Sequence, residues 1–200
     1  MPRGRRRAFD RDAALDIAMN MFWSRGYAGT SVADLTAAMG INPPSLYSAF
    51  GNKRALFEET LQRYAGECAR YVTEAMAEPT ARAAALRFLT ATVEAATQPD
   101  RPAGCLAVQG GLACAEEDRE VVELLVAYRA GTRHMLLDRF EKAVADGDLP
   151  PSADCPALAR YVIAAAEGLN VEAAAGAPRA ELLTAATLGA SVVPDTRNPA

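Results

Sequence analysis

Histidine, lysine and paired cysteines are scarce in this sequence of 200 residues. His134 is the one histidine, and no Cys-x-x-Cys pair occurs. A zinc finger and a disulfide framework are excluded by the wide spacing of Cys68, Cys105, Cys114 and Cys155, which favours a reducing cytoplasm. No apolar run approaches the roughly 20 residues of a membrane span. No apolar segment follows the basic N-terminus, so we expect no signal peptide.

Sequence motifs for catalysis are also missing. We find no glycine-rich phosphate loop, no metal-binding motif, no Ser/His/Asp order and no paired carboxylates placed for acid–base work. We therefore expect no enzyme activity, no cofactor and no bound metal. A small helical enzyme stays an alternative, which a turnover screen with a Cys105→Ala control would expose.

Charge is distributed unevenly along an otherwise ordinary globular composition of 50% hydrophobic and 23% charged residues. Residues 1–56 contain eight basic and four acidic side chains, whereas residues 57–200 contain 13 basic and 21 acidic ones. A basic N-terminal part on an acidic body indicates an anionic partner such as nucleic acid, although a solubilising basic tail fits equally. Two lysines against abundant alanine suggest a GC-rich bacterial genome.

Apolar residues recur with helical spacing and strand alternation is nearly absent, which predicts an all-α protein of about nine helices. Asp10 suits the N-cap of a first helix that ends at Gly26, and Ser31 with Asp34 suits a capping box. We expect the helices to begin near Asp10, Ser31, Pro44, Asn52, Thr80, Cys105, Glu116, Asp154 and Pro178. The fourth is expected to run to about Ala77 and the sixth from Cys105 to Ala115.

Two consecutive prolines mark the start of the third helix in the segment GINPPSLYSAFGNK. Proline costs little in the first turn of a helix, where the N–H groups have no intrahelical acceptor. Asn42 or Pro43 is then the cap, and the extended geometry imposed by a following proline favours Pro43. This short helix buries Leu46 and Phe50 and leaves its other side chains outside.

The second helix, the turn at Gly40 and this short helix together predict a helix-turn-helix, whose second helix enters the DNA major groove. Small hydroxyl and apolar side chains can contact base edges. A tyrosine hydroxyl, or an N–H group at the N-terminus of a helix, can donate to a phosphate. Lys53 opposes the helix dipole, a conflict that a nearby phosphate would remove. The candidate DNA-binding residues are Arg5 and Arg6 of a basic arm, Thr30, Ser31, Pro43, Pro44, Ser45, Tyr47, Ser48 and Lys53.

Residues 9–57 closely resemble the DNA-binding domain of TetR/AcrR-family transcriptional regulators. The matching positions are Phe22, Gly26, Tyr27, Thr30, Ser31, Ala37, Gly40, Leu46, Tyr47, Phe50 and Lys53. The resemblance implies a helix-turn-helix domain over residues 1–55 and an effector-binding and dimerisation domain over residues 56–200. It also implies a homodimeric repressor that binds a palindromic DNA operator and is released by a small-molecule ligand. The Asn-Pro-Pro sequence departs from many members, which leaves the operator sequence open.

The last two helices carry apolar and small residues at helical spacing, which fits intramolecular core as well as a dimer face. The resemblance favours a dimer interface of Leu158, Tyr161, Val162, Ala165, Leu169, Leu182, Ala186, Gly189 and Val193. The middle helices are then expected to enclose an apolar ligand pocket, although ordinary core packing suits the same residues. The candidates are Leu61, Tyr64, Cys68, Phe88, Cys105, Val108, Gln109, Leu125, Tyr128 and His134.

Cys105 supports a second hypothesis, because a thiol at a helix N-terminus has a lowered pKa and raised reactivity. It would then sense an electrophile or oxidant, or a soft metal together with His134 and Cys68. A buried, inert cysteine is the alternative. For the ligand-controlled regulator, a tilt of the long helix from Lys53 to Ala77 is the expected coupling between the two domains.

Overall fold

The computed structural model describes residues 9–111 and 116–195, and every regular element within these ranges is helical. In chain order the elements are α1 (Arg11–Arg25), α2 (Val32–Met39), α3 (Pro43–Phe50), α4 (Lys53–Met76), α5 (Ala81–Ala96), α6 (Leu106–Gln109), the 3₁₀-helix η1 (Glu116–Asp118), α7 (Arg119–Ala145), α8 (Cys155–Ala174) and α9 (Arg179–Ala190). The predicted all-α class with nine α-helices is confirmed for this part of the chain.

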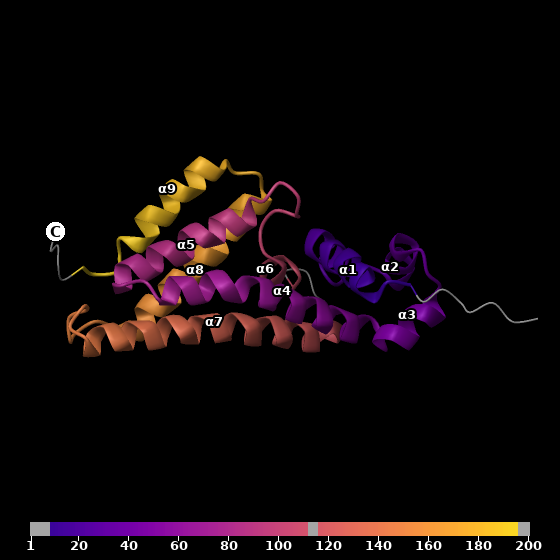
Figure 1. Cartoon of the computed structure of the whole chain (residues 1–200), viewed down its shortest axis with the longest axis horizontal. Helices are drawn as coiled ribbons and strands as arrows, with labels where there is room; N and C mark the ends of the chain where they lie inside the picture. The colour runs from indigo at the N-terminus through magenta and orange to yellow at the C-terminus, as the bar shows by residue number, and fades with distance from the viewer. Residues whose placement is uncertain (1–8, 112–115, 196–200) are drawn as a thin grey trace, which may run out of the picture.

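Figure 1 shows an elongated molecule with α1, α2 and α3 gathered at one end. The long helices α4 and α7 run side by side through the body, where α5 and α8 pack beside them and α9 packs on α5 and α8 (Figure 1). No helix within the described ranges is long and apolar enough to cross a membrane. We call α1, α2 and α3 together the head, and α4 connects the head to the body.

Two clusters of buried side chains hold this arrangement together. The head cluster joins α1, α2 and α3 to the first half of α4, to α6 and to the start of α7. Its centre is aromatic: the Phe22 and Tyr27 rings both meet the Phe57 ring edge-on, at centroid distances of 5.1 Å and 5.2 Å. The body cluster joins the second half of α4 to α5, α7, α8 and α9. The helices α4 and α7 contribute to both clusters and so connect the head and the body.

Side-chain caps fix where the helices begin, as the sequence predicts. The caps of α1, α2, α4, α5 and α8 accept backbone N–H groups, and they are Asp10, Ser31, Asn52, Thr80 and Asp154. Of the two predicted caps of α3, the favoured one, Pro43, is wrong, and the alternative, Asn42, is the cap. Asn42 is extended and its Oδ1 accepts the Ser45 N–H at 2.9 Å, so Pro43 is the first helical residue. An asparagine carbonyl can bond the orphan N–H groups, which a proline side chain cannot do.

The predicted helix from Cys105 to Ala115 is shorter in the structure. The helix α6 ends at Gln109, and its N-cap position, Cys105, makes no capping hydrogen bond. Two adjacent glycines follow, and a Cβ at Gly111 would lie 2.6 Å from Leu125 Cδ1. The backbone therefore approaches α7 closely at this point, and residues 112–115 lie outside the described ranges.

Candidate nucleic-acid interface and ligand cavities

The helix α3 presents one apolar and one polar face, as predicted. Leu46 and Phe50 are buried in the head, whereas Pro43, Pro44 and Ser48 are exposed and the Tyr47 side chain is 48% exposed. Ser45 is half-buried, and its hydroxyl donates to Asn42 Oδ1 at 2.8 Å. The cap and the two prolines thus fix a short helix whose outer side chains are free to meet the floor of a DNA groove.

The start of α2 differs from the prediction at Thr30. Its side chain is completely buried, and its hydroxyl donates to the Gly26 carbonyl at 2.8 Å, so Thr30 cannot reach DNA. Ser31 is exposed, but its N–H donates to Asp34 Oδ2 at 3.0 Å within the capping box. The Ser31 hydroxyl also donates to Asp34 Oδ2, and this bond, followed by the bond from the Ser31 N–H, lowers the Asp34 pKa, with a smaller contribution from the Arg25 charge. Thr30 is therefore a structural residue that shapes the entry into α2.

Arg25 is a candidate that the sequence analysis missed. It is exposed in the last turn of α1, and its effect on the Asp34 pKa places its charge near the start of α2. A basic residue beside a helix N-terminus suits a phosphate. The missed signal was the single cation at the end of the first helix. The predicted arm residues Arg5 and Arg6 lie outside the described ranges.

Lys53 opens α4, and its Nζ lies 4.0 Å from the centroid of the Tyr27 ring. This cation–π contact offsets part of the unfavourable position of a cation at the positive end of a helix. The neighbouring Arg54 bonds Glu120 of α7 at 3.0 Å, which ties the start of α4 to the body. The two adjacent cations therefore make different contacts.

A cavity of about 50 Å³ lies in the body among α4, α5, α6, α7 and α8. We call it the central cavity, and four predicted pocket residues line it: Phe88, Cys105, Val108 and Tyr128. The sequence analysis missed its polar groups, since charged residues are expected on the surface. Arg129 pairs with Glu167 at 3.1 Å and donates to the Ala107 carbonyl at 2.6 Å, and Asn170 is buried nearby.

The remaining predicted pocket residues lie elsewhere. Leu61 and Leu125 are buried in the head cluster, and Gln109 is the last residue of α6. Leu125 also lines a neighbouring cavity of about 140 Å³, which shares Val108, Arg129 and Glu167 with the central cavity. Tyr64 and Cys68 line a separate pocket beside α1, which we call the side pocket. The prediction for His134 is wrong. Its side chain is 73% exposed on α7 and lies 3.7 Å from Asp138, because the turn of the helix points it away from the body.

Cys105, the thiol predicted to be reactive, and Cys68, its predicted partner in a soft-metal site, are both desolvated. Burial raises the pKa of Cys105 and also that of Cys68, and the Tyr64 hydroxyl donates to Cys105 Sγ at 3.1 Å. The expectation of a lowered thiol pKa at Cys105 is therefore wrong. The four-residue helix after it has too few aligned peptide dipoles to outweigh desolvation. Within the described ranges no three His, Cys, Asp or Glu side chains are grouped to hold a metal.

Comparison with known proteins identifies the family. One family model, described as bacterial regulatory proteins of the tetR family, matches residues 14–60. A second, described as the tetracyclin repressor-like C-terminal domain, matches residues 79–187. The chain belongs to the TetR family of transcriptional regulators. It is 33% identical over 183 residues to the HTH-type transcriptional repressor ComR of Escherichia coli (strain K12), covering 90% of this chain and 87% of that protein.

Solved structures of other TetR-family regulators have the same fold. A cysteine mutant of the regulator CifR, complexed with 26-bp double-strand operator DNA, is 40% identical with a TM-score of 0.90, covering 96% of this chain and all of that one. A TetR regulator from Rhodococcus sp. RHA1 is 58% identical but has a TM-score of only 0.65, covering 92% and 99% of the two chains. This TetR-family regulator therefore has the shape of the DNA-complexed relative, although its sequence is more similar to the other.

Of the predicted dimer residues in this TetR-family regulator, several are buried within the protomer itself. Val162, Ala186 and Val193 are completely buried in the body cluster, so their assignment to an interface is wrong. The small residues instead let α9 approach α5, since a Cβ at Gly189 would lie 3.3 Å from Leu89 Cδ1. Leu158 is half-buried against the same cluster.

An open groove of about 410 Å³ between α8 and α9 retains the other candidates. Five of its lining residues were predicted: Tyr161, Ala165, Leu169, Leu182 and Gly189. The sequence analysis missed Leu188, whose side chain lines this groove and is 72% exposed. Val171 and Val192 are also exposed, at 44% each. The groove is lined mostly by apolar and small residues, with Glu172 and Glu181 as its charged members, and such a surface is typical of one covered by a second subunit.

Proposed function

We propose that this protein is a homodimeric repressor that places the outer face of α3 in successive major grooves of a palindromic operator. In this proposal residues 1–55 form the DNA-binding domain and residues 56–200 the effector-binding and dimerisation domain. The exposed Tyr47 side chain on a helix fixed by Asn42 and two prolines is the observation that carries it. Pro43, Pro44 and Ser48 meet base edges, while Ser31, Arg25 and Lys53 lie toward phosphates.

The small central cavity supports release of the operator by a ligand. A volume of about 50 Å³ holds a few water molecules, whereas pockets for drug-sized ligands occupy roughly 300–1,000 Å³. An effector must therefore separate α4, α7 and α8 before it can bind at Arg129 and Glu167. Because the present shape matches a DNA-complexed relative, ligand binding favours a different conformer and shifts the population away from it.

The helix α6 is the shortest route from this cavity to the head. Ala107 and Val108 line the cavity, and the Gly110 carbonyl at the end of α6 accepts the Tyr27 N–H at 3.1 Å. Tyr27 in turn packs against Phe57 and Lys53 at the start of α4. We infer that expansion of the cavity moves α6, and that this movement adds to the tilt of α4 predicted from the sequence.

A regulator with this role needs no catalytic activity, and we propose that the chain is not an enzyme and acts in the cytoplasm. A covalent sensor at Cys105 receives no support from its buried thiol.

Selection of DNA from a random duplex pool at low salt tests the proposal. The wild type is expected to enrich a palindrome whose half-sites are about 34 Å apart or a multiple of it. Tyr47→Ala and Lys53→Ala are expected to lose this enrichment, whereas His134→Ala, exposed on α7, retains it. Failure of the wild type to enrich any sequence would overturn the proposed DNA-binding function.

A further inference from the structure

The side pocket is larger than the central cavity and lies closer to the head. Its volume is about 300 Å³, and it is bounded by α1, α4, α5 and the loop that leads from α5 toward α6. Its lining consists of Trp23, Tyr64, Glu67, Cys68, Arg70, Tyr71, Ala95, Gln98 and Arg101. Only the Tyr71 side chain is shared with the lining of the central cavity, so the two are separate sites.

Three aromatic rings make the inner wall of the side pocket suitable for a planar ligand. The Trp23 and Tyr64 rings meet edge-to-face with centroids 5.1 Å apart, and Tyr71 lies about two helical turns beyond Tyr64 on α4. Trp23 is 2% exposed, and its Nε1 has no hydrogen-bond partner among the described residues. A buried N–H without an acceptor is costly, so a small displacement of Trp23 that brings this N–H to an acceptor in the pocket would be favourable.

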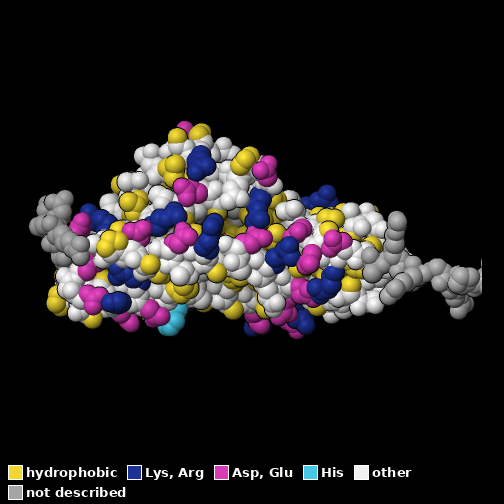
Figure 2. Space-filling view, in the orientation of Figure 1, with side chains coloured by type: hydrophobic (Ala, Val, Ile, Leu, Met, Phe, Trp, Pro, Cys, Tyr) yellow, Lys and Arg dark blue, Asp and Glu magenta, His cyan; other side chains and the backbone are white. Residues whose placement is uncertain are grey.

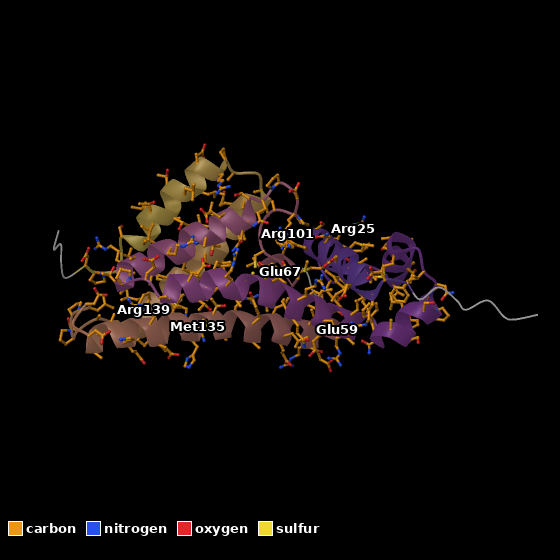
Figure 3. The ribbon with its side chains drawn as sticks, viewed as in Figure 1. Arg25, Glu59, Glu67, Arg101, Met135 and Arg139 are labelled. Carbon is orange, nitrogen blue, oxygen red and sulfur yellow. The ribbon has the colours of Figure 1, made fainter. Side chains whose placement is uncertain are left out.

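The rim of the side pocket carries an excess of positive charge. Arg101, on the loop, donates to the Glu67 carboxylate on α4, and Figure 3 shows these two side chains close together beside the loop. Both are about one-third exposed, at 35% and 33%, so solvent and solutes reach them. Arg70, an exposed side chain that lies 4.0 Å from Glu74, contributes a second cation to the same lining. A carboxylate arriving from solution meets two guanidinium groups and one carboxylate that it can replace.

We propose that the side pocket binds a small aromatic carboxylate, with its ring among Trp23, Tyr64 and Tyr71 and its carboxylate on Arg101 in place of Glu67. The ring buries apolar surface against the aromatic wall, and a displacement of Trp23 on binding gives the indole N–H an acceptor. This is a second ligand site, distinct from the central cavity that we assign to the effector.

A ligand in the side pocket also alters DNA binding, an inference that rests on the proposed function as a DNA-binding regulator. Trp23 belongs to α1 of the head, whereas Arg101 belongs to the loop that leads to α6. A ligand that joins Arg101 to the aromatic wall fixes the loop against the head. Occupancy therefore changes the freedom of α6 and, through the bond between Tyr27 and Gly110, the placement of α2 and α3.

Intrinsic fluorescence provides a direct assay, since Trp23 is the only tryptophan in the chain. The purified full-length protein is titrated with benzoate, with benzamide as the neutral isostere and acetate as the carboxylate without a ring. Benzoate is expected to cause a saturable change in the Trp23 emission, and benzamide and acetate are expected to bind at least about tenfold more weakly, the equivalent of one charge-assisted hydrogen bond.

Two variants with opposite expected effects on benzoate affinity distinguish a change in binding from a failure to fold. Arg101→Gln removes the cation and is expected to weaken benzoate binding by about tenfold or more. Glu67→Gln removes the competing carboxylate and is expected to tighten it severalfold. Arg119→Gln, an exposed cation on α7 paired with Glu123, is the matched control and retains the wild-type affinity.

The proposal is overturned if benzoate causes no saturable change in the wild type, or if the Arg101 and Glu67 variants bind it as the wild type does. Operator affinity is measured separately by the anisotropy of a labelled duplex from the DNA selection. If benzoate binds as expected but no duplex is enriched, the ligand site stands and the proposed repressor function fails. If a duplex is enriched and benzoate does not bind, the proposed repressor function stands and the proposed ligand site fails.

Discussion

The Tyr27 N–H donates to the Gly110 carbonyl at 3.1 Å, joining the loop after α1 to the end of α6. The backbones are close here, since a Cβ at Gly26 would lie 3.5 Å from the Gln109 carbonyl oxygen. The head is thus bonded directly to the segment that lines the central cavity, besides being joined to the body through α4. The regulator has two mechanical connections between its proposed ligand-binding and DNA-binding parts.

Lys53 is expected to contribute to operator affinity through a phosphate. Lys53→Met keeps much of the packing on Tyr27 but removes the charge, so affinity falls across all DNA sequences and the salt dependence decreases by about one phosphate contact. Duplex binding at several salt concentrations measures both quantities. Tyr27→Phe, which keeps the ring, is the control. An unchanged salt dependence with lower thermal stability would show that Lys53 serves only the cation–π contact.

The Cys105 thiol is expected to react slowly at neutral pH. Burial raises its pKa above the ordinary value of about 8.5, so less thiolate is present near neutrality and alkylation accelerates only as pH rises through the raised value. Iodoacetamide labelling from neutral to alkaline pH, resolved by peptide mass spectrometry, follows this thiol separately from the other cysteines. Labelling at neutral pH as fast as that of an unfolded sample would restore the covalent-sensor hypothesis.

Gly104 is expected to tolerate alanine less well than Gly176. Both have positive φ angles, +86° and +91°, and each substitution costs about 1–2 kcal/mol for the left-handed backbone. At Gly104 the new Cβ would also lie 2.7 Å from Gln109 Oε1 and 2.8 Å from the Asn170 carbonyl, whereas nothing lies within 4 Å at Gly176. Urea unfolding should show a further loss of about 1–3 kcal/mol for Gly104→Ala. Equal losses for the two variants would contradict the close packing described here.

Leu188 is expected to hold the two protomers together. Leu188→Arg places a charge on the exposed side of the α8–α9 groove, so the dimer dissociates while the fold of each protomer is retained. Sedimentation velocity measures the association and circular dichroism measures the helix content. Met135→Arg, at a 40% exposed position on α7, is the matched control. A fully dimeric Leu188→Arg protein would place the interface elsewhere.

The distribution of charge over the visible face does not reveal where the proposed DNA-binding and ligand-binding sites lie. Figure 2 shows basic and acidic side chains mixed over the visible face of the molecule, with no broad patch of one sign. Many of these charges form pairs, such as Arg63 with Asp16 at 2.8 Å and Arg87 with Glu74 at 3.2 Å. The basic residues of the N-terminal quarter are therefore not gathered into one patch on this face.

The amino-acid sequence by itself determined the helices and the helix-turn-helix. Capping residues, prolines and apolar spacing act within a few residues, so Asp10, Ser31 and the Pro43–Pro44 pair place helix starts without knowledge of the fold. The exposed face of α3 followed from the same local pattern. The matching positions in residues 9–57 were likewise sufficient for the family.

Tertiary structure decided which residues of each helix are available for function. Burial of Thr30 and Val162, exposure of His134 and Leu188, and the raised pKa of Cys105 depend on neighbours that are distant in sequence. A helical stripe of small residues suits the approach of α5 as well as a second subunit, and only the packing of Gly189 on Leu89 distinguishes them. The side pocket arises in the same way, because Trp23, Glu67 and Arg101 meet only when α1, α4 and the loop before α6 pack together.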